Sequence, residues 1–318
     1  MSAQPATAGP ECPSVSVIIP AYNAGRFLGR ALDSVCAQTY PLEHLEVVVI
    51  DDGSSDETAE VAGLFAESLP GLQIYSQRNR GVAAARNLGI LVSTAELVAF
   101  LDADDQWQPD KISRQVAVFA DNPALGLVHC GCDFVDSDGH LLPDWPRKSR
   151  LDQGDILLEF LCDFFLITSA VMVPRAVLDE VGAFDEALRV GEDNELFLRI
   201  LAAYPAGCAT ETLLLRTVRP DSLSREDYDL DARVDLEIIE RFLAMHPAFA
   251  RAHQERIDRY LAEYLFGYGY RLLDDGRVGQ ARAVFMQSLG RHFSTGAARS
   301  LLRSYLPHSL VRRYHPPA

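Results

Sequence analysis

The sequence predicts an α/β fold, in which a mostly parallel, doubly wound central sheet is flanked by helices and followed by a helical C-terminal region. Over the first 105 residues, short β-branched runs alternate with segments of helical periodicity, a pattern typical of parallel sheets covered on both faces. Three of these runs end in polar or acidic clusters, at the edge where such sheets bind ligands. From about residue 227 the chain becomes Arg-rich and helical in periodicity.

The first 105 residues supply four strands and three helices. The strands are apolar runs bounded by turn residues, at 15–19, 45–50, 72–76 and 97–101. The helices between them have apolar residues at helical spacing, at 26–38, 56–68 and 80–91. Farther along we expect a helix to about 120, a strand at 125–132, a polar loop at 133–150, a helix at 156–165, a strand at 168–173 and a helix from about 192.

The chain divides into a disordered tail at 1–14, an α/β domain at 15–226 and a helical region at 227–318. The tail has neither a basic start nor an apolar core, which argues against a signal peptide. In the helical region, helices at 236–245, 250–273 and 280–289 are expected, the last two resembling a single tetratricopeptide-type hairpin. One such hairpin cannot bury a solenoid core alone, so we expect it to pack on the α/β domain, form a homodimer or contact a membrane edge.

Composition limits the classes of function. The net charge is −16, and the 11 arginines and 5 acids of residues 251–318 leave the negative charge in the first 250 residues, which argues against a nucleic-acid partner. The six cysteines form no C-x-x-C pair, as expected for structural thiols in a reducing compartment. No window reaches 18 clean apolar residues. We therefore expect a cytoplasmic protein without a transmembrane span, with peripheral membrane contact suggested only weakly by Arg312 and Arg313.

The most informative stretch is the apolar run that ends in Asp102, Asp104 and Asp105. As a buried strand, it delivers three acids to the carboxyl edge of the sheet. Two carboxylates 4 Å apart repel each other by roughly 4 kcal/mol at an effective dielectric constant of 20. Either water solvates these acids on a surface turn, or a divalent cation such as Mg²⁺ or Mn²⁺ neutralises them.

The motifs that the sequence lacks narrow the class of ligand. A G-x-G-x-x-G turn after a strand and a G-x-x-x-x-G-K-[ST] loop are both missing from the sequence, which has only two lysines. A nucleoside diphosphate held through a cation fits better. Tyr22 offers a stacking face, Asp52 can accept an imide N–H and Arg86 can reach a phosphate. Ordinary packing and surface charge explain Tyr22 and Arg86 equally well when each is considered alone.

A second acidic pair, Glu192 and Asp193, occupies the first turn of a predicted helix. The helix dipole stabilises acids at this position, so an ordinary helix start is one interpretation. The other is a general base at the mouth of the site.

Five segments of the chain, in this order and spacing, resemble family 2 glycosyltransferases, which have the GT-A (Rossmann-like) fold. The resemblance covers about residues 14–224. The segments are Val15-Ser-Val-Ile-Ile-Pro20-Ala-Tyr22-Asn23, Val49-Ile-Asp51-Asp52-Gly-Ser54-Ser-Asp56, Asn79-Arg-Gly81-Val-Ala-Ala-Ala-Arg86-Asn87, Leu101-Asp102-Ala-Asp104-Asp105, and Val181-Gly-Ala-Phe184-Asp-Glu with Gly191-Glu-Asp193.

The resemblance implies a nucleotide site at the start of the domain. Pro20, Tyr22 and Asn23 would lie along the base and ribose, and Asp52 would face the base. Arg86 falls in a matching segment and stays a candidate phosphate contact.

The resemblance also implies the metal and the catalytic base. Asp104 would bind Mn²⁺ or Mg²⁺, with Asp102 nearer the ribose or the water on the metal, and Asp105 as a substitute ligand. Asp193 matches the base of the family. Arg219 stands where related sequences carry a histidine, and an arginine would hold phosphate rather than the cation.

The implied activity is an inverting transfer of a sugar from a nucleotide-diphospho-sugar, a UDP-sugar in the first instance, to an acceptor hydroxyl. The acceptor would be a glycan, a glycolipid or a glycoprotein in polysaccharide or glycoconjugate biosynthesis. Two alternatives stay open. One is a non-catalytic scaffold that keeps the GT-A fold, and the other is a sugar nucleotidyltransferase, which would need an N-terminal Gly- and Lys-containing loop missing from this sequence.

Overall fold

The structure is a computed structural model, and it describes residues 12–145, 150–219 and 228–305. Contacts between Cα atoms divide the chain into two compact units, residues 1–226 and 227–318. The described residues therefore exclude most of the predicted tail, the residues that directly follow Arg219, and Arg312 and Arg313.

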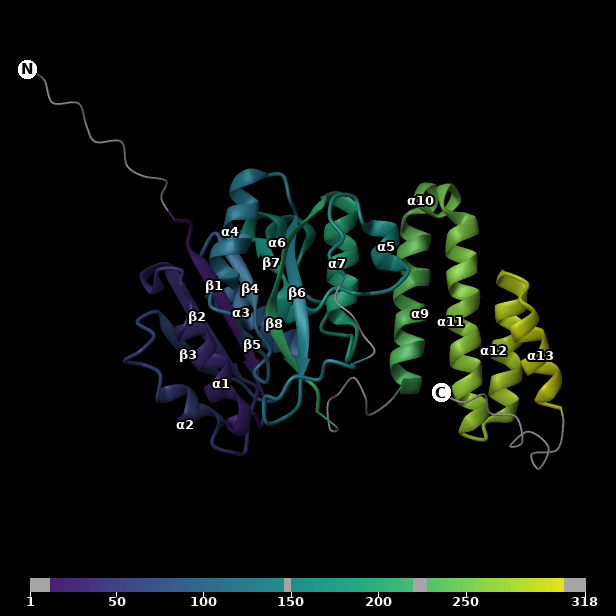
Figure 1. The fold of residues 1–318 in the computed structure, drawn as a ribbon, viewed down its shortest axis with the longest axis horizontal. Helices are drawn as coiled ribbons and strands as arrows, with labels where there is room; N and C mark the ends of the chain where they lie inside the picture. The colour runs from purple at the N-terminus through teal and green to yellow at the C-terminus, as the bar shows by residue number, and fades with distance from the viewer. Residues whose placement is uncertain (1–11, 146–149, 220–227, 306–318) are drawn as a thin grey trace, which may run out of the picture. The chain divides into compact units, whose positions relative to one another are not determined.

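The first unit is built on one eight-stranded sheet with the order β3-β2-β1-β4-β7-β6-β8-β5 (Figure 1). β7 and β5 run against the other six strands, so the sheet is mostly parallel and the predicted fold class is confirmed. The strands are β1 Val15–Ala21, β2 Leu45–Asp51, β3 Leu72–Ser76, β4 Leu97–Phe100, β5 Gln106–Trp107, β6 Leu127–Val135, β7 Met172–Pro174 and β8 Ala206–Thr217.

Helices cover both faces of this sheet. They are α1 Gly25–Cys36, α2 Thr58–Gly63, α3 Val82–Val92, α4 Lys111–Asp121, α5 Leu157–Leu161, α6 Arg175–Val181 and α7 Glu192–Ala203. Val17 and Ile19 of β1 belong to the large core that also contains side chains of α1 and α4. Ile18 points to the other face, where the missing side chain of Gly89 in α3 makes room for it. This alternation is the period of two that a strand buried on both faces requires.

The second half of the first unit departs from the predicted elements in three places. The helix expected at 156–165 is only α5, because the chain turns sharply at Phe164, whose φ is 43°. The strand expected at 168–173 begins as a 3₁₀ turn at Thr168–Ala170 before β7. β6 continues through Val135 into the expected polar loop, because parallel pairing with β8 extends to that residue.

The second unit consists of helices, α9 Tyr228–Met245, α10 Pro247–Ala252, α11 Gln254–Asp274, α12 Val278–Arg291 and α13 Thr295–Arg303. Figure 1 shows α9, α11 and α12 lying alongside one another. Their shared core contains Ala232, Tyr268 and Phe285. The hydroxyl of Tyr264 also donates to Asp235 on α9 (2.9 Å). In the part of the chain that is described, no helix is both long and apolar enough to cross a bilayer.

Two glycines of α11 provide a matched test of this helical core. Gly267 is exposed with open space around it, whereas a Cβ on Gly269 would lie 2.8 Å from the Phe285 ring. Replacing a helical glycine with alanine gains up to about 1 kcal/mol at either site, and overpacking costs about 1–3 kcal/mol at Gly269 alone. We therefore predict that Gly267→Ala raises the unfolding temperature. Gly269→Ala should unfold at a lower temperature than Gly267→Ala, because it also carries the overpacking cost. Differential scanning calorimetry of the full chain measures both, and equal shifts would contradict the packing described here.

Candidate active site

The carboxyl ends of three adjacent strands bring together the polar clusters found in the sequence. β1 lies between β2 and β4 and is parallel to both. The loops after these strands begin at Tyr22, Asp52 and Leu101. The backbone N–H of Asp52 donates to the carbonyl of Ala21 (2.8 Å), and that of Leu101 donates to the carbonyl of Ile18 (3.0 Å). The three loops therefore leave the sheet side by side.

The first two loops are tied to each other through Asn23. Its φ of 47° lies in the left-handed region that asparagine tolerates better than most residues. The side-chain oxygen of Asn23 accepts from the backbone N–H of Ser55 (2.8 Å), and its own N–H donates to the hydroxyl of Ser54 (2.9 Å). Pro20 is buried within β1, while Tyr22 is 54% exposed. The ring of Tyr22 is thus accessible for stacking.

Asp52 is buried and organises the approach to α3. One oxygen of its carboxylate accepts from the side-chain amide of Gln77 (2.7 Å) and the backbone N–H of Arg80 (2.9 Å). The other oxygen accepts from the N–H of Gly81 (2.8 Å), whose φ of 90° favours glycine. The carboxylate of Asp52 therefore fixes the loop in front of α3, a contact that the sequence did not reveal.

The three acids after β4 have different surroundings. Asp105 is 3% exposed, and its two oxygens accept from the hydroxyl of Ser169 (2.6 Å) and the N–H of Thr217 (2.9 Å). Burial, together with the charges of Asp104 and Asp102, raises the pKa of Asp105 well above its usual range. Asp105 therefore holds this loop to the end of β8, and both of its carboxylate oxygens accept hydrogen bonds there.

Asp102 and Asp104 remain partly accessible, with 34% and 23% of their side chains exposed. Asp104 forms an ion pair with Arg219, in which Nε lies 3.1 Å from Oδ2. Burial and the charge of Asp102 raise the pKa of Asp104, and the Arg219 charge opposes this rise. The two carboxylates are therefore held in a partly covered position where opposite charge is favourable.

Arg86 connects the loop after β4 to α7. It is 4% exposed, and its two terminal nitrogens donate to Asp102 (2.7 Å) and to Glu192 (2.5 Å). Its guanidinium also lies over the Phe184 ring, 5.3 Å from the centroid. Burial lowers the pKa of Arg86, but the charges of Asp102, Glu192 and Asp193 raise it overall. The predicted phosphate contact is therefore a buried bridge between two acidic segments.

Glu192 is the buried member of the acidic pair. Burial and the neighbouring charge of Asp193 raise the pKa of Glu192 to about 7, although the Arg86 charge opposes them. Asp193 is less covered, and its carboxylate accepts from the hydroxyl of Thr168 (2.7 Å) and the N–H of Asn194 (2.9 Å). The first turn of α7 thus presents Asp193 at the same site to which Arg86 and Asp102 belong.

A second set of contacts fixes the start of α7. Asn87, next to Arg86 on α3, both donates to the carbonyl of Phe184 and accepts from its N–H (2.9 Å each). Arg80 forms an ion pair with Glu186 (2.7 Å). The matching segments around residues 80–87 and 181–193 are therefore in direct contact, which explains why both belong to one pattern.

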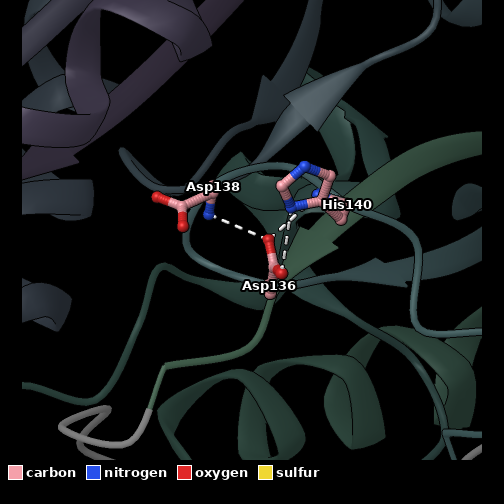
Figure 2. Close-up of side chains that lie close together, drawn as sticks. All are labelled: Asp136, Asp138 and His140. Atoms are coloured by element: carbon pink, nitrogen blue, oxygen red, sulfur yellow. Dashed lines mark hydrogen bonds and ion pairs between the residues drawn. The ribbon is translucent and has the colours of Figure 1, made fainter.

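A different group of side chains meets the geometry of a metal site. Asp136, Asp138 and His140 follow β6, and one ligand atom from each lies within 4.8 Å of the other two. Figure 2 shows Asp136 accepting from the backbone N–H groups of Asp138 and His140. Those contacts close the turn on their own, and Asp138 and His140 are exposed. The cluster is therefore explained as a turn.

Sequence patterns missed several residues of the site. The acidic pair drew attention to Glu192 but not to its contact with Arg86, and nothing marked Thr168, Ser169 or Thr217 as partners of Asp193 and Asp105. A hydroxyl side chain carries no sequence signal for such a contact. The usable clue was Arg86, because an arginine within an alanine-rich helix segment needs acidic partners if it is buried.

The raised pKa of Glu192 predicts a measurable pH effect. Because the folded chain binds this proton more tightly than the unfolded chain, the contribution of Glu192 to the free energy of unfolding is largest below pH 4.5 and is lost as the pH rises to about 7. Glu192→Gln retains an acceptor for Arg86 but removes the titration. We predict that its stability relative to the wild type increases between pH 4.5 and 8 by on the order of 3 kcal/mol.

Urea unfolding at several pH values measures this change. Glu67→Gln, at an exposed position, is the control and should show a stability difference independent of pH. Parallel pH profiles for Glu192→Gln and the wild type would contradict the assignment of a raised pKa to Glu192.

Comparison with known proteins identifies the family. The profile of glycosyl transferase family 2 matches residues 16–181, just over half of the chain. An uncharacterized glycosyltransferase of Rickettsia typhi is 31% identical over 201 residues, covering 60% of this chain and 61% of the relative. One from Nostoc is 42% identical over 181 residues, covering 54% of each chain. The match thus spans about three fifths or less of these relatives.

Solved structures show the same fold. S. aureus TarS 1-349 in complex with UDP-GlcNAc has a TM-score of 0.61 at 17% identity, covering 92% of this chain and 89% of TarS. The Pyrobaculum calidifontis mannosyltransferase PcManGT, in complex with GDP-Man and Mn²⁺, has a TM-score of 0.54 at 20% identity, covering 96% and 82%. The strand alternation, the clustered loops and the family match together lead to one conclusion. This chain belongs to glycosyltransferase family 2 and has the GT-A fold.

Proposed function

We propose that this chain transfers a sugar, with inversion, from a nucleotide-diphospho-sugar to a hydroxyl group of a saccharide, lipid-linked or protein-linked acceptor. A UDP-sugar is the proposed donor, and Mn²⁺ or Mg²⁺ the proposed cofactor. The observation that carries the proposal is the meeting of an accessible aromatic ring, a partly exposed aspartate pair and a helix-start aspartate at one edge of the sheet. The UDP-GlcNAc bound to TarS supports the donor class.

The nucleotide would bind along the first two loops. Tyr22 provides the exposed ring for stacking on the base, with Pro20 and Asn23 beside it. Asp52 would face the base while it also holds the loop at residues 77–81. Because Asn23 and Asp52 are already fixed by hydrogen bonds, these two residues would need little ordering when the donor binds.

The aspartate pair fits a hard divalent cation. Such ions prefer oxygen ligands and bind through one or two carboxylates together with phosphate oxygens, and Asp102 and Asp104 offer partly exposed carboxylates two residues apart. Asp104 would be the direct ligand and Asp102 would lie nearer the ribose or a metal-bound water. When bound, the ion would supply positive charge against the diphosphate leaving group.

Asp193 is the proposed general base. The Thr168 hydroxyl and the Asn194 N–H fix its carboxylate, and it accepts the proton of the acceptor hydroxyl. The hydroxyl oxygen then forms a bond to the anomeric carbon while the bond from that carbon to the diphosphate oxygen breaks. The attack comes from the face opposite the leaving group, so the configuration at the anomeric carbon inverts.

The test of this proposal is the Asp193→Asn variant, which keeps an acceptor for Thr168 but cannot take a proton. We predict that transfer from the preferred donor falls by about 10²–10⁴-fold while donor affinity stays close to that of the wild type. Transfer is measured by release of nucleoside diphosphate with a panel of UDP-, GDP- and dTDP-sugars and glycan acceptors, and donor affinity by calorimetry.

Asp179→Asn, on the exposed side of α6, is the matched control and should retain full activity. If Asp193→Asn transferred sugar at the wild-type rate, the assignment of the base would be wrong. If the folded wild type released no diphosphate from any donor in the panel, the proposed donor class would be wrong.

A further inference from the structure

The ion pair between Arg219 and Asp104 occupies the carboxylate that the proposed function gives to the metal. Nε of Arg219 lies 3.1 Å from Oδ2 of Asp104. The guanidinium also lies over the Phe27 ring of α1, 5.0 Å from its centroid. Both members of the pair are largely covered, with 22% and 23% of their side chains exposed. Arg219 is therefore held in this position by two contacts.

Each member of the aspartate pair thus faces an arginine. Arg86 of α3 is shared between Asp102 and Glu192, whereas Arg219, in the segment after β8, pairs with Asp104. A dication that binds Asp104 must share that carboxylate with a guanidinium, which brings two positive centres together. The charge that would attract a metal ion to Asp104 is already compensated in the unliganded protein.

We propose that Arg219 competes with the divalent cation for Asp104, so that the cation binds tightly only together with a nucleoside diphosphate. The inference rests on the proposed function and deepens it by assigning an order to donor and metal binding. Arg219 would pair with Asp104 in the unliganded protein and with the diphosphate when the donor is bound.

The exchange follows from the chemistry of the groups. A guanidinium pairs with phosphate oxygens through two parallel N–H donors, so an arriving diphosphate offers Arg219 a partner of at least equal strength. When Arg219 turns to the diphosphate, Asp104 regains its full charge and can bind the cation. Because coupling between two ligands is reciprocal, each must raise the affinity of the other by the same factor.

The experiment titrates Mn²⁺ alone into the full chain and follows free Mn²⁺ by electron paramagnetic resonance, with no substrate present. We expect Arg219→Gln to bind Mn²⁺ at least about tenfold more tightly than the wild type, because the competing charge is gone. Arg219→Lys keeps the charge and should bind as weakly as the wild type. Circular dichroism establishes that each variant is folded.

A matched control separates direct competition for Asp104 from the general electrostatic effect of a nearby positive charge. Arg216 lies on β8, and its charge also acts on Asp104. Arg216→Gln removes the same charge without removing the Asp104 partner, so we expect its affinity for Mn²⁺ alone to change by less than about threefold. Equal effects of Arg216→Gln and Arg219→Gln would overturn the proposal, as would equal Mn²⁺ affinities of Arg219→Gln and the wild type.

The titration is repeated with UDP and with GDP. In the wild type we expect the nucleotide to raise Mn²⁺ affinity by at least about tenfold, and in Arg219→Gln by much less. An equal rise in both proteins would overturn the proposal. A wild type that binds neither nucleotide would contradict the proposed donor class, whereas the ratio of affinities for Mn²⁺ alone would still decide whether Arg219 competes.

Discussion

The site depends on the two ion pairs that the buried guanidinium of Arg86 forms with Asp102 and Glu192. Parallel strands deliver Asp102 to the edge of the sheet, while α7 delivers Glu192 and Asp193 from a segment about 90 residues later, and Arg86 joins the two. Removing one partner from a buried charge pair typically costs about 3–5 kcal/mol. Arg86 therefore connects the proposed donor side of the site to the proposed base side, while the hydrogen bonds of Asp52 and Asn87 hold α3 in place.

Negatively charged side chains are in excess at the carboxyl edge of the sheet. The structure distributes them unequally: Asp105 is buried against hydroxyl and backbone donors, Asp102 and Glu192 share Arg86, and Asp104 is paired with Arg219. Burial is the main cause of the raised pKa values of Glu192, Asp104 and Asp105, and the charges of neighbouring carboxylates add to it. In the proposed function, a divalent cation would supply positive charge that faces both these carboxylates and the diphosphate.

The sequence predicted most of the first half of the sheet because each strand there is a short, mostly apolar run bounded by turn residues, and the expected bounds of β3 match the observed strand. It failed where tertiary contacts decide the conformation. The two-residue β5 exists only through pairing with β8, and Phe164 breaks the expected helix by a positive φ. In the site, charged motifs marked Asp102, Asp104 and Asp193, but the hydroxyl partners and the bridging role of Arg86 depend on contacts between distant segments.

The central claim is that the aspartate pair at the sheet edge binds a donor diphosphate together with a cation. Calorimetric titration of UDP-, GDP- and dTDP-sugars, with Mn²⁺ and with chelator, in the wild type and in Asp104→Ala, tests it most directly. The account predicts that one nucleotide sugar binds with Mn²⁺ and that this binding is lost with chelator and in the variant. Undiminished binding under both conditions would contradict it.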